Sequence, residues 1–120
     1  MENDYERAIK FYKKSIISFP GSHEAYSNLS RILSEIGQYE LAEKYLIKVI
    51  RLKPNFLMAY QNLFNVYIKG YKRKKARDVL HECLKIAPNN PLIISNVGRF
   101  LLEEDNLDEA KKYLKKAISL

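Results

Sequence analysis

The stretch PNFLMAYQN, residues 54–62, has two counterparts in this chain at equal separations on either side. PGSHEAYSN occupies residues 20–28 and PNNPLIISN occupies residues 88–96, and each runs from a proline to an asparagine. A fixed period of this kind is the signature of an array of repeated structural units. Further columns keep the same register along the 120 residues, including Ala8, Ala42, Ala76 and Ala110. Internal repetition is therefore predicted to organise the whole fold.

Each period contains two helical patterns separated by a stop signal. Residues 26–33 and 41–50 both place apolar or small side chains at i, i+3, i+4 and i+7, which predicts two helices with one apolar face each. Gly37 can end the first helix by adopting a positive φ, and Pro54 stops the second. No alternating pattern typical of a strand is present. The predicted helices cover 4–18, 23–36, 39–52, 57–69, 73–86, 91–104 and 107–119.

The repeated residues resemble the tetratricopeptide repeat, whose pattern combines an aromatic, leucine, small and bulky residues with a final proline. In the first complete copy these are Tyr26, Leu29, Ser30, Leu33, Ala42, Leu46 and Pro54. The resemblance implies an all-α, right-handed superhelical solenoid of antiparallel helix pairs. It divides 1–120 into the second helix of a partial repeat (1–22), two repeats (23–56 and 57–90) and a last one truncated at its end (91–120). Phe64 departs from the pattern at a small position, and Tyr71 stands where a glycine is expected.

Composition is that of an ordinary folded protein and removes several functional classes. Apolar residues make up 47% of the chain and charged residues 29%. The single cysteine, Cys83, allows no internal disulfide and is predicted to be a buried packing residue. The sequence has no apolar signal-peptide core, no membrane-spanning stretch, no glycine-rich phosphate loop and no metal-spaced Cys/His set. We therefore expect a cytoplasmic protein segment without enzyme activity, cofactor or metal.

Three asparagines stand inside predicted helices, where this residue is unfavourable because its amide competes for backbone groups. Asn28, Asn62 and Asn96 occupy one column, and each falls on the helical face opposite the packed stripe. In tetratricopeptide arrays this face of the first helix of each pair lines the concave surface. The resemblance thus implies a ladder of amides in a groove. The neighbours on the predicted groove are Ser27, Arg31, Met58, Gln61, Asn65, Ile68, Leu92, Ser95, Arg99 and Leu102.

The segments AYSNL and AYQNL resemble the tetratricopeptide repeats of the O-linked N-acetylglucosamine transferase family, whereas IISNVG does so less closely. In that family, asparagines of the matching column hold the backbone of an extended peptide. An amide suits this role because it carries both a donor and an acceptor. The competing interpretation is that each asparagine bonds a neighbouring helix and only stabilises the stack. The two-carboxylate clamp of chaperone-binding repeats fits poorly, since its basic positions fall on Ser27, Leu92 and Asn96.

The net charge of +7 is concentrated in the stretch KGYKRKKAR, residues 69–77. This run predicts either a solvated helix start or a patch for an acidic partner, RNA or an anionic membrane. Because the excess is local, nucleic acid and membranes are not the expected partners. The cations of this basic run are Lys69, Lys72, Arg73, Lys74, Lys75 and Arg77.

Two functional hypotheses follow from these patterns. The first is a protein–protein interaction module, an adaptor or scaffold that binds an extended peptide segment in its concave groove. The second is a structural or self-assembly segment that associates through exposed end helices. Its basis is the apolar residues of the first and last predicted helices, which lack a neighbouring helix or a polar cap. We therefore also expect either a piece of a longer array or an oligomer formed through the ends.

Overall fold

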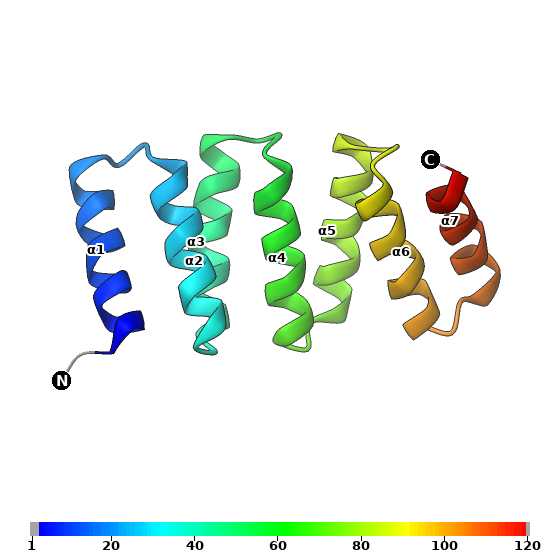
Figure 1. Cartoon of the computed structure of the whole chain (residues 1–120), viewed down its shortest axis with the longest axis horizontal. Coiled ribbons are helices and arrows are strands. Elements are labelled where there is room, and N and C mark those ends of the chain that lie inside the picture. The colour runs from blue at the N-terminus through cyan, green and yellow to red at the C-terminus, as the bar shows by residue number, and fades with distance from the viewer. Residues whose placement is uncertain (1–2, 120) are drawn as a thin grey trace.

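The computed structural model describes residues 3–119, which form seven α-helices and no strand. Figure 1 shows the helices arranged in chain order along an elongated body, whose extents are 50 × 27 × 22 Å. The helix ends agree with the predicted ones to within one residue, and the all-α solenoid is confirmed. The helices are α1 (Asp4–Ser18), α2 (His23–Glu35), α3 (Tyr39–Leu52), α4 (Leu57–Lys69), α5 (Arg73–Ile86), α6 (Pro91–Glu103) and α7 (Leu107–Ser119).

The turns within the pairs α2–α3, α4–α5 and α6–α7 share one geometry and lie along one edge of the array (Figure 1). Each contains one residue with a left-handed backbone: Gly37 at φ 84°, Tyr71 at φ 60° and Asp105 at φ 60°. The next amide then donates to a carbonyl in the last turn of the helix, as Gln38 does to Leu33 at 2.8 Å. Only glycine adopts this conformation without strain. Tyr71 is therefore a strained residue, although its turn has the same geometry as the other two.

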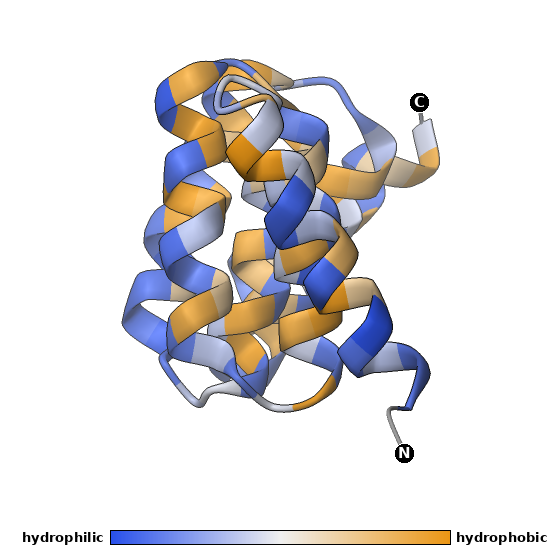
Figure 2. Ribbon diagram, turned by 90° about the vertical axis from the view of Figure 1, so that its left-hand side faces the viewer, coloured by the Kyte–Doolittle hydropathy of each residue, from blue (hydrophilic) through white to orange (hydrophobic). Residues whose placement is uncertain are grey.

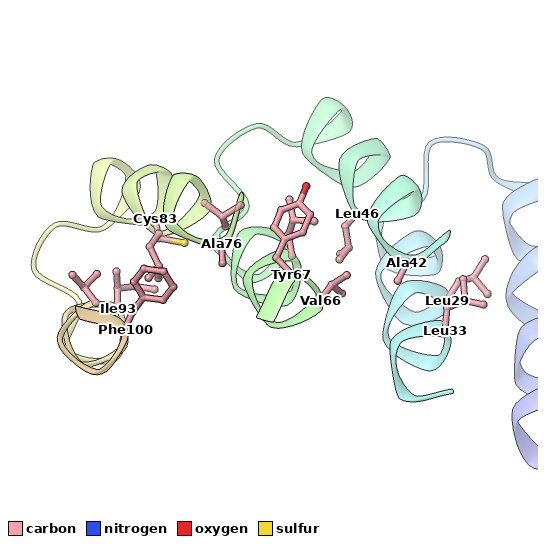
Figure 3. Packing of buried hydrophobic residues seen from close by; sticks show 14 residues of the cluster. Leu29, Leu33, Ala42, Leu46, Val66, Tyr67, Ala76, Cys83, Ile93 and Phe100 are labelled. Carbon is pink, nitrogen blue, oxygen red and sulfur yellow. The ribbon is translucent and has the colours of Figure 1, made fainter. Parts of the chain in front are cut away.

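The hydrophobic core is a continuous layer between the row of first helices and the row of second helices. In Figure 3 its side chains follow one another from Leu29 to Phe100. Every helix alternates between hydrophobic and hydrophilic stretches (Figure 2), as expected of helices that bury one face. Cys83 is fully buried in this layer, which confirms its predicted packing role. The repeated alanines that are fully buried are Ala42, Ala76 and Ala110.

The column of small residues keeps its predicted role at two of three positions. Ser30 is 1% exposed, and a Cβ added at Gly98 would lie 2.7 Å from side-chain atoms of Leu114, so α6 and α7 approach closely. Phe64, in contrast, is only partly buried, and its ring lies edge-on to Phe100 with the centroids 6.1 Å apart. The larger side chain at this position is therefore directed toward the following repeat.

Candidate binding groove on the first helices

The asparagine ladder lies on α2, α4 and α6, the first helices of the three pairs. Asn28, Asn62 and Asn96 are each half-buried. A hollow of about 100 Å³ between α2 and α4 is bordered by Asn62 and Asn65. A second hollow of about 200 Å³ between α4 and α6 is bordered by Asn65 and Asn96. Each hollow thus receives one asparagine of the ladder, and Asn65 belongs to both.

The other predicted groove residues divide between these hollows and the surface around them. Arg31 lines the first hollow, whereas Ile68 and Arg99 line the second, where Phe64 and Phe100 add apolar surface. Among those outside both hollows, Met58, Leu92 and Leu102 are 55%, 56% and 40% exposed. The predicted groove residues that border neither hollow are Ser27, Asn28, Met58, Gln61, Leu92, Ser95 and Leu102.

The three asparagines of the ladder differ in their side-chain hydrogen bonds. The side-chain oxygen of Asn96 accepts from Nη2 of Arg99 on the same helix. Within residues 3–119, the side chains of Asn28 and Asn62 have no hydrogen-bond partner. The interpretation in which the ladder ties neighbouring helices together therefore has no bond to support it. Both free amides keep a donor and an acceptor for another molecule.

Arg31 and Ser27, two further polar residues on α2, differ in how accessible their side chains are to a partner. Nη1 of Arg31 lies 3.2 Å from Oε1 of Glu35, one turn along α2, and both side chains are exposed. Such a pair contributes about 0–1 kcal/mol, so a carboxylate from a partner can replace Glu35. The hydroxyl oxygen of Ser27 is covered and has no hydrogen-bond partner in the described chain. A partner can reach it only after the side chain changes rotamer, so Ser27 does not present its hydroxyl to the groove.

Three of the six cations of the basic run make ion pairs within the molecule, and Arg73 and Arg77 are two of them. Arg73 Nε donates to Oε1 of Glu104 at 2.7 Å, and Nη2 lies 3.1 Å from Oε2 of Glu103. Arg77 lies 3.4 Å from the same Glu104, and both guanidinium groups lie over the ring of Phe100. The hydrogen bond raises the pKa of Arg73 and lowers the pKa of Glu104. These contacts join the start of α5 to the end of α6.

The third inward cation joins α5 to α3 and α4. Lys75 Nζ lies 3.7 Å from Oε2 of Glu43 and 5.7 Å from the ring centroid of Tyr67. Tyr71, which the run encloses, is 91% exposed. The surface left for an acidic partner is therefore smaller than the sequence suggested. The cations of the run without an ion pair to any described residue are Lys69, Lys72 and Lys74.

Two other kinds of site do not occur in the part of the chain that the structure describes. Among residues 3–119, no three or more His, Cys, Asp or Glu side chains are grouped closely enough to hold a metal ion. No helix in this same range has the length and apolar character needed to cross a bilayer.

A cavity of about 370 Å³ among α5, α6 and α7, called the α5–α7 cavity, was not expected from the sequence. The residues at equivalent positions of successive repeats contain a signal for this cavity. Leu101 lines the cavity and occupies the position that Tyr67 has in the preceding repeat, so the third interface has a smaller side chain there. The loss of volume becomes visible only once the neighbouring helices are placed.

Several known proteins have sequences similar to this chain. Human Protein O-mannosyl-transferase TMTC1 is 28% identical over 120 residues, covering 97% of this chain and 14% of that protein. The Hsp70-Hsp90 organising protein of Plasmodium falciparum is 31% identical over 100 residues, covering 74% of this chain and 35% of that protein. This chain therefore spans only a minor part of these relatives.

Solved structures and family models agree on the architecture. A crystal structure of MamA superposes with a TM-score of 0.84 at 28% identity, covering 92% of this chain and 65% of that one. Models described as tetratricopeptide repeat match residues 1–64 and residues 93–120. The first of these alone covers more than half of the sequence. The chain therefore belongs to the tetratricopeptide repeat family.

Proposed function

We propose that this chain is a protein–protein interaction module that binds an extended peptide segment on the face formed by α2, α4 and α6. Arrays of this family typically mediate contacts between proteins. The observation that supports the peptide mode is the pair of unpartnered amides at Asn28 and Asn62, in a column that Asn96 continues. Asn62 and Asn96 border hollows between successive helices. In this proposal residues 1–120 act as one array.

The chemistry of the ladder suits a main chain better than a particular side chain. Each amide can donate to a peptide carbonyl and accept from a peptide N–H, and neither bond depends on the sequence of the partner. Specificity then comes from the surroundings. Arg31 and Arg99 favour acidic or polar groups, whereas the apolar wall of the second hollow at Ile68 favours an apolar anchor. We expect a partner segment that combines both.

The test begins with a peptide selected from a display library against the whole chain. Its affinity is measured by calorimetry for the wild type and for the triple variant Asn28→Ala, Asn62→Ala, Asn96→Ala. Each lost hydrogen bond costs about 1 kcal/mol, or several-fold in affinity. Asn89→Ala, at an exposed asparagine outside the helices, serves as the matched control. Unchanged affinity with a lowered melting temperature would assign the ladder a structural role instead.

Salt separates the groove from the basic run as the site of binding. Contacts built on amides and apolar side chains should weaken little when salt is added. Binding of a polyanion at Lys69, Lys72 and Lys74 should weaken steeply, because counterions are released on association. A steep salt dependence of the selected peptide, abolished by changing these lysines, would move the proposed site to the basic run.

Self-assembly is a second candidate function because both outer helices expose large apolar side chains. On α1, Phe11 is 64% and Ile17 79% exposed, and on α7, Ile118 is 87% exposed. Exposed apolar surface of this kind favours association. Light scattering over a range of concentrations tests it, with Ile17→Lys as the interfering variant. Association that this variant reduces would support assembly through α1, whereas a strict monomer at every concentration would reject it.

No catalytic role is part of this proposal. The transferase named among the relatives aligns with this chain over only 14% of its own length, so its activity is not carried over. A cytoplasmic location is included in the proposal, and the lone buried cysteine is consistent with it. Cell fractionation of the natural protein tests the location directly.

A further inference from the structure

The α5–α7 cavity is a separate space from the groove. Its volume is about 370 Å³, and the polar residues at its border are Arg77, His81, Glu104, Asn106 and Glu109. Phe100 is 4% exposed and lines both this cavity and the second hollow of the groove, so its ring forms the wall between them. The apolar side chains that line the cavity are Leu80, Leu84, Val97, Phe100, Leu101 and Tyr113.

The two preceding interfaces between repeats place a tyrosine at one of two equivalent positions. Leu80 and Leu101 of the cavity correspond, one repeat earlier, to Leu46 and Tyr67. Tyr67 is 7% exposed and belongs to the core, as Figure 3 shows. Two repeats earlier than Leu80 stands Tyr12, which is partly buried against the core. Only in the last interface are both positions leucine, so neither of them carries an aromatic ring, although Phe100 stands where the preceding repeat has Val66.

The surroundings of Tyr67 indicate what the cavity can hold. Burial, and then the interaction of its hydroxyl with Glu43, raise the pKa of Tyr67, and Lys75 lies 5.7 Å from its ring centroid. The residues one repeat after Glu43 and Lys75 are Arg77 and Glu109, and both border the cavity. A ring placed in the cavity as Tyr67 is placed in its own interface therefore lies between these two groups.

The side chains that face the oxygen of the ring carry opposite charges in the two interfaces. Where Glu43 offers acceptor oxygens to the hydroxyl of Tyr67, Arg77 offers only N–H donors. An oxygen placed beside Arg77 therefore accepts a hydrogen bond, in addition to the ion pair that Nη2 of Arg77 makes with Glu104 at 3.4 Å. The ring itself meets an apolar floor and the aromatic side chain of Phe100, which favour burial of an aromatic group.

We propose that the α5–α7 cavity binds a single aromatic ring that carries an oxygen acceptor, the chemistry of a phenol. The ring packs against Phe100 and Leu101, and its oxygen accepts a hydrogen bond from Arg77. This site lies outside the groove and does not depend on the peptide-binding proposal. The ring can belong to a free small molecule or to a tyrosine side chain.

The test uses p-cresol, the side-chain analogue of tyrosine, titrated into the complete chain and followed by NMR amide shifts. We expect saturable shifts in α5, α6 and α7. Leu101→Tyr places in the cavity the ring that Tyr67 places in its own interface, so it should weaken p-cresol binding about tenfold or more and raise the melting temperature. Leu80→Tyr places the ring at the position that Tyr12 occupies in the first interface, and it provides a second filled variant. Leu52→Tyr adds the same ring at a 41% exposed position of α3 and should leave binding unchanged.

Two further probes define the ligand. Toluene lacks the oxygen and should bind about tenfold more weakly than p-cresol, and Arg77→Met should remove that difference. N-acetyl-tyrosine amide carries the ring on a peptide unit. Binding of p-cresol alone would indicate a free aromatic ligand, and binding of both would indicate a side chain from a partner. Absence of saturable p-cresol binding, or binding unchanged in both filled variants, would overturn the proposal.

Discussion

Replacing Gly98 by alanine tests the close approach of α6 and α7, because two opposing effects of known size meet there. Alanine in a helix interior is favoured over glycine by about 0.5–1 kcal/mol. The added methyl group, however, would lie 2.7 Å from both Cγ and Cδ2 of Leu114, and 3.5 Å from its backbone nitrogen. Forcing a methyl group into a packed contact costs about 1–3 kcal/mol. We expect the steric cost to exceed the gain, with a net loss of about 1 kcal/mol in the free energy of unfolding.

The decisive measurement is the same substitution in two backgrounds, with urea unfolding followed by circular dichroism. In Leu114→Ala the clashing atoms are gone, so Gly98→Ala should then stabilise the protein by about 0.5–1 kcal/mol. The expected result is a reversal of sign between the backgrounds. Gly21→Ala, where a Cβ would meet no atom within 4 Å, shows the effect of the same change without a clash. Equal effects of Gly98→Ala in both backgrounds would refute the reasoning from close packing.

Three further predictions concern the turn, the ion pairs and the core thiol. Tyr71→Gly should raise the free energy of unfolding by about 1 kcal/mol, because φ 60° strains tyrosine and its side chain is 91% exposed; a loss of stability in urea would mean that the ring makes a stabilising contact. Arg73 lowers the pKa of Glu104 below its ordinary value of 4.5. The stability that this ion pair contributes is therefore complete above pH 4.5 and is lost as the pH falls through the lowered pKa. Arg73→Ala should therefore flatten the acid side of a plot of melting temperature against pH, and identical slopes for both proteins would contradict this. Burial raises the pKa of Cys83 to about 11, so alkylation at neutral pH should be slow in the native protein and fast in urea; equal rates would show that the thiol is accessible.

The helices and turns of this protein could be predicted from its sequence because the signals that specify them are short-range. A helix is specified by the spacing of its apolar residues and by the residues at its ends, and all of these lie within one period. Gly37 marked a left-handed turn, and Tyr71, at the same position in the next repeat, has a left-handed backbone too. The burial of Cys83 followed from its place on an apolar stripe. The groove asparagines were found in the same way, although their role as a peptide site stays a prediction.

Only the tertiary structure decided how the charges and volumes of different repeats meet. Lys72 and Arg73 are adjacent in sequence, yet Arg73 pairs with Glu104 and Glu103, whereas Lys72 has no ion pair with any described residue. The α5–α7 cavity likewise depends on Leu101 and on side chains from two other helices. A periodic pattern shows which face of each helix is buried. It does not show which side chains from distant parts of the sequence come into contact across that face, because their fit depends on the position of every helix between them.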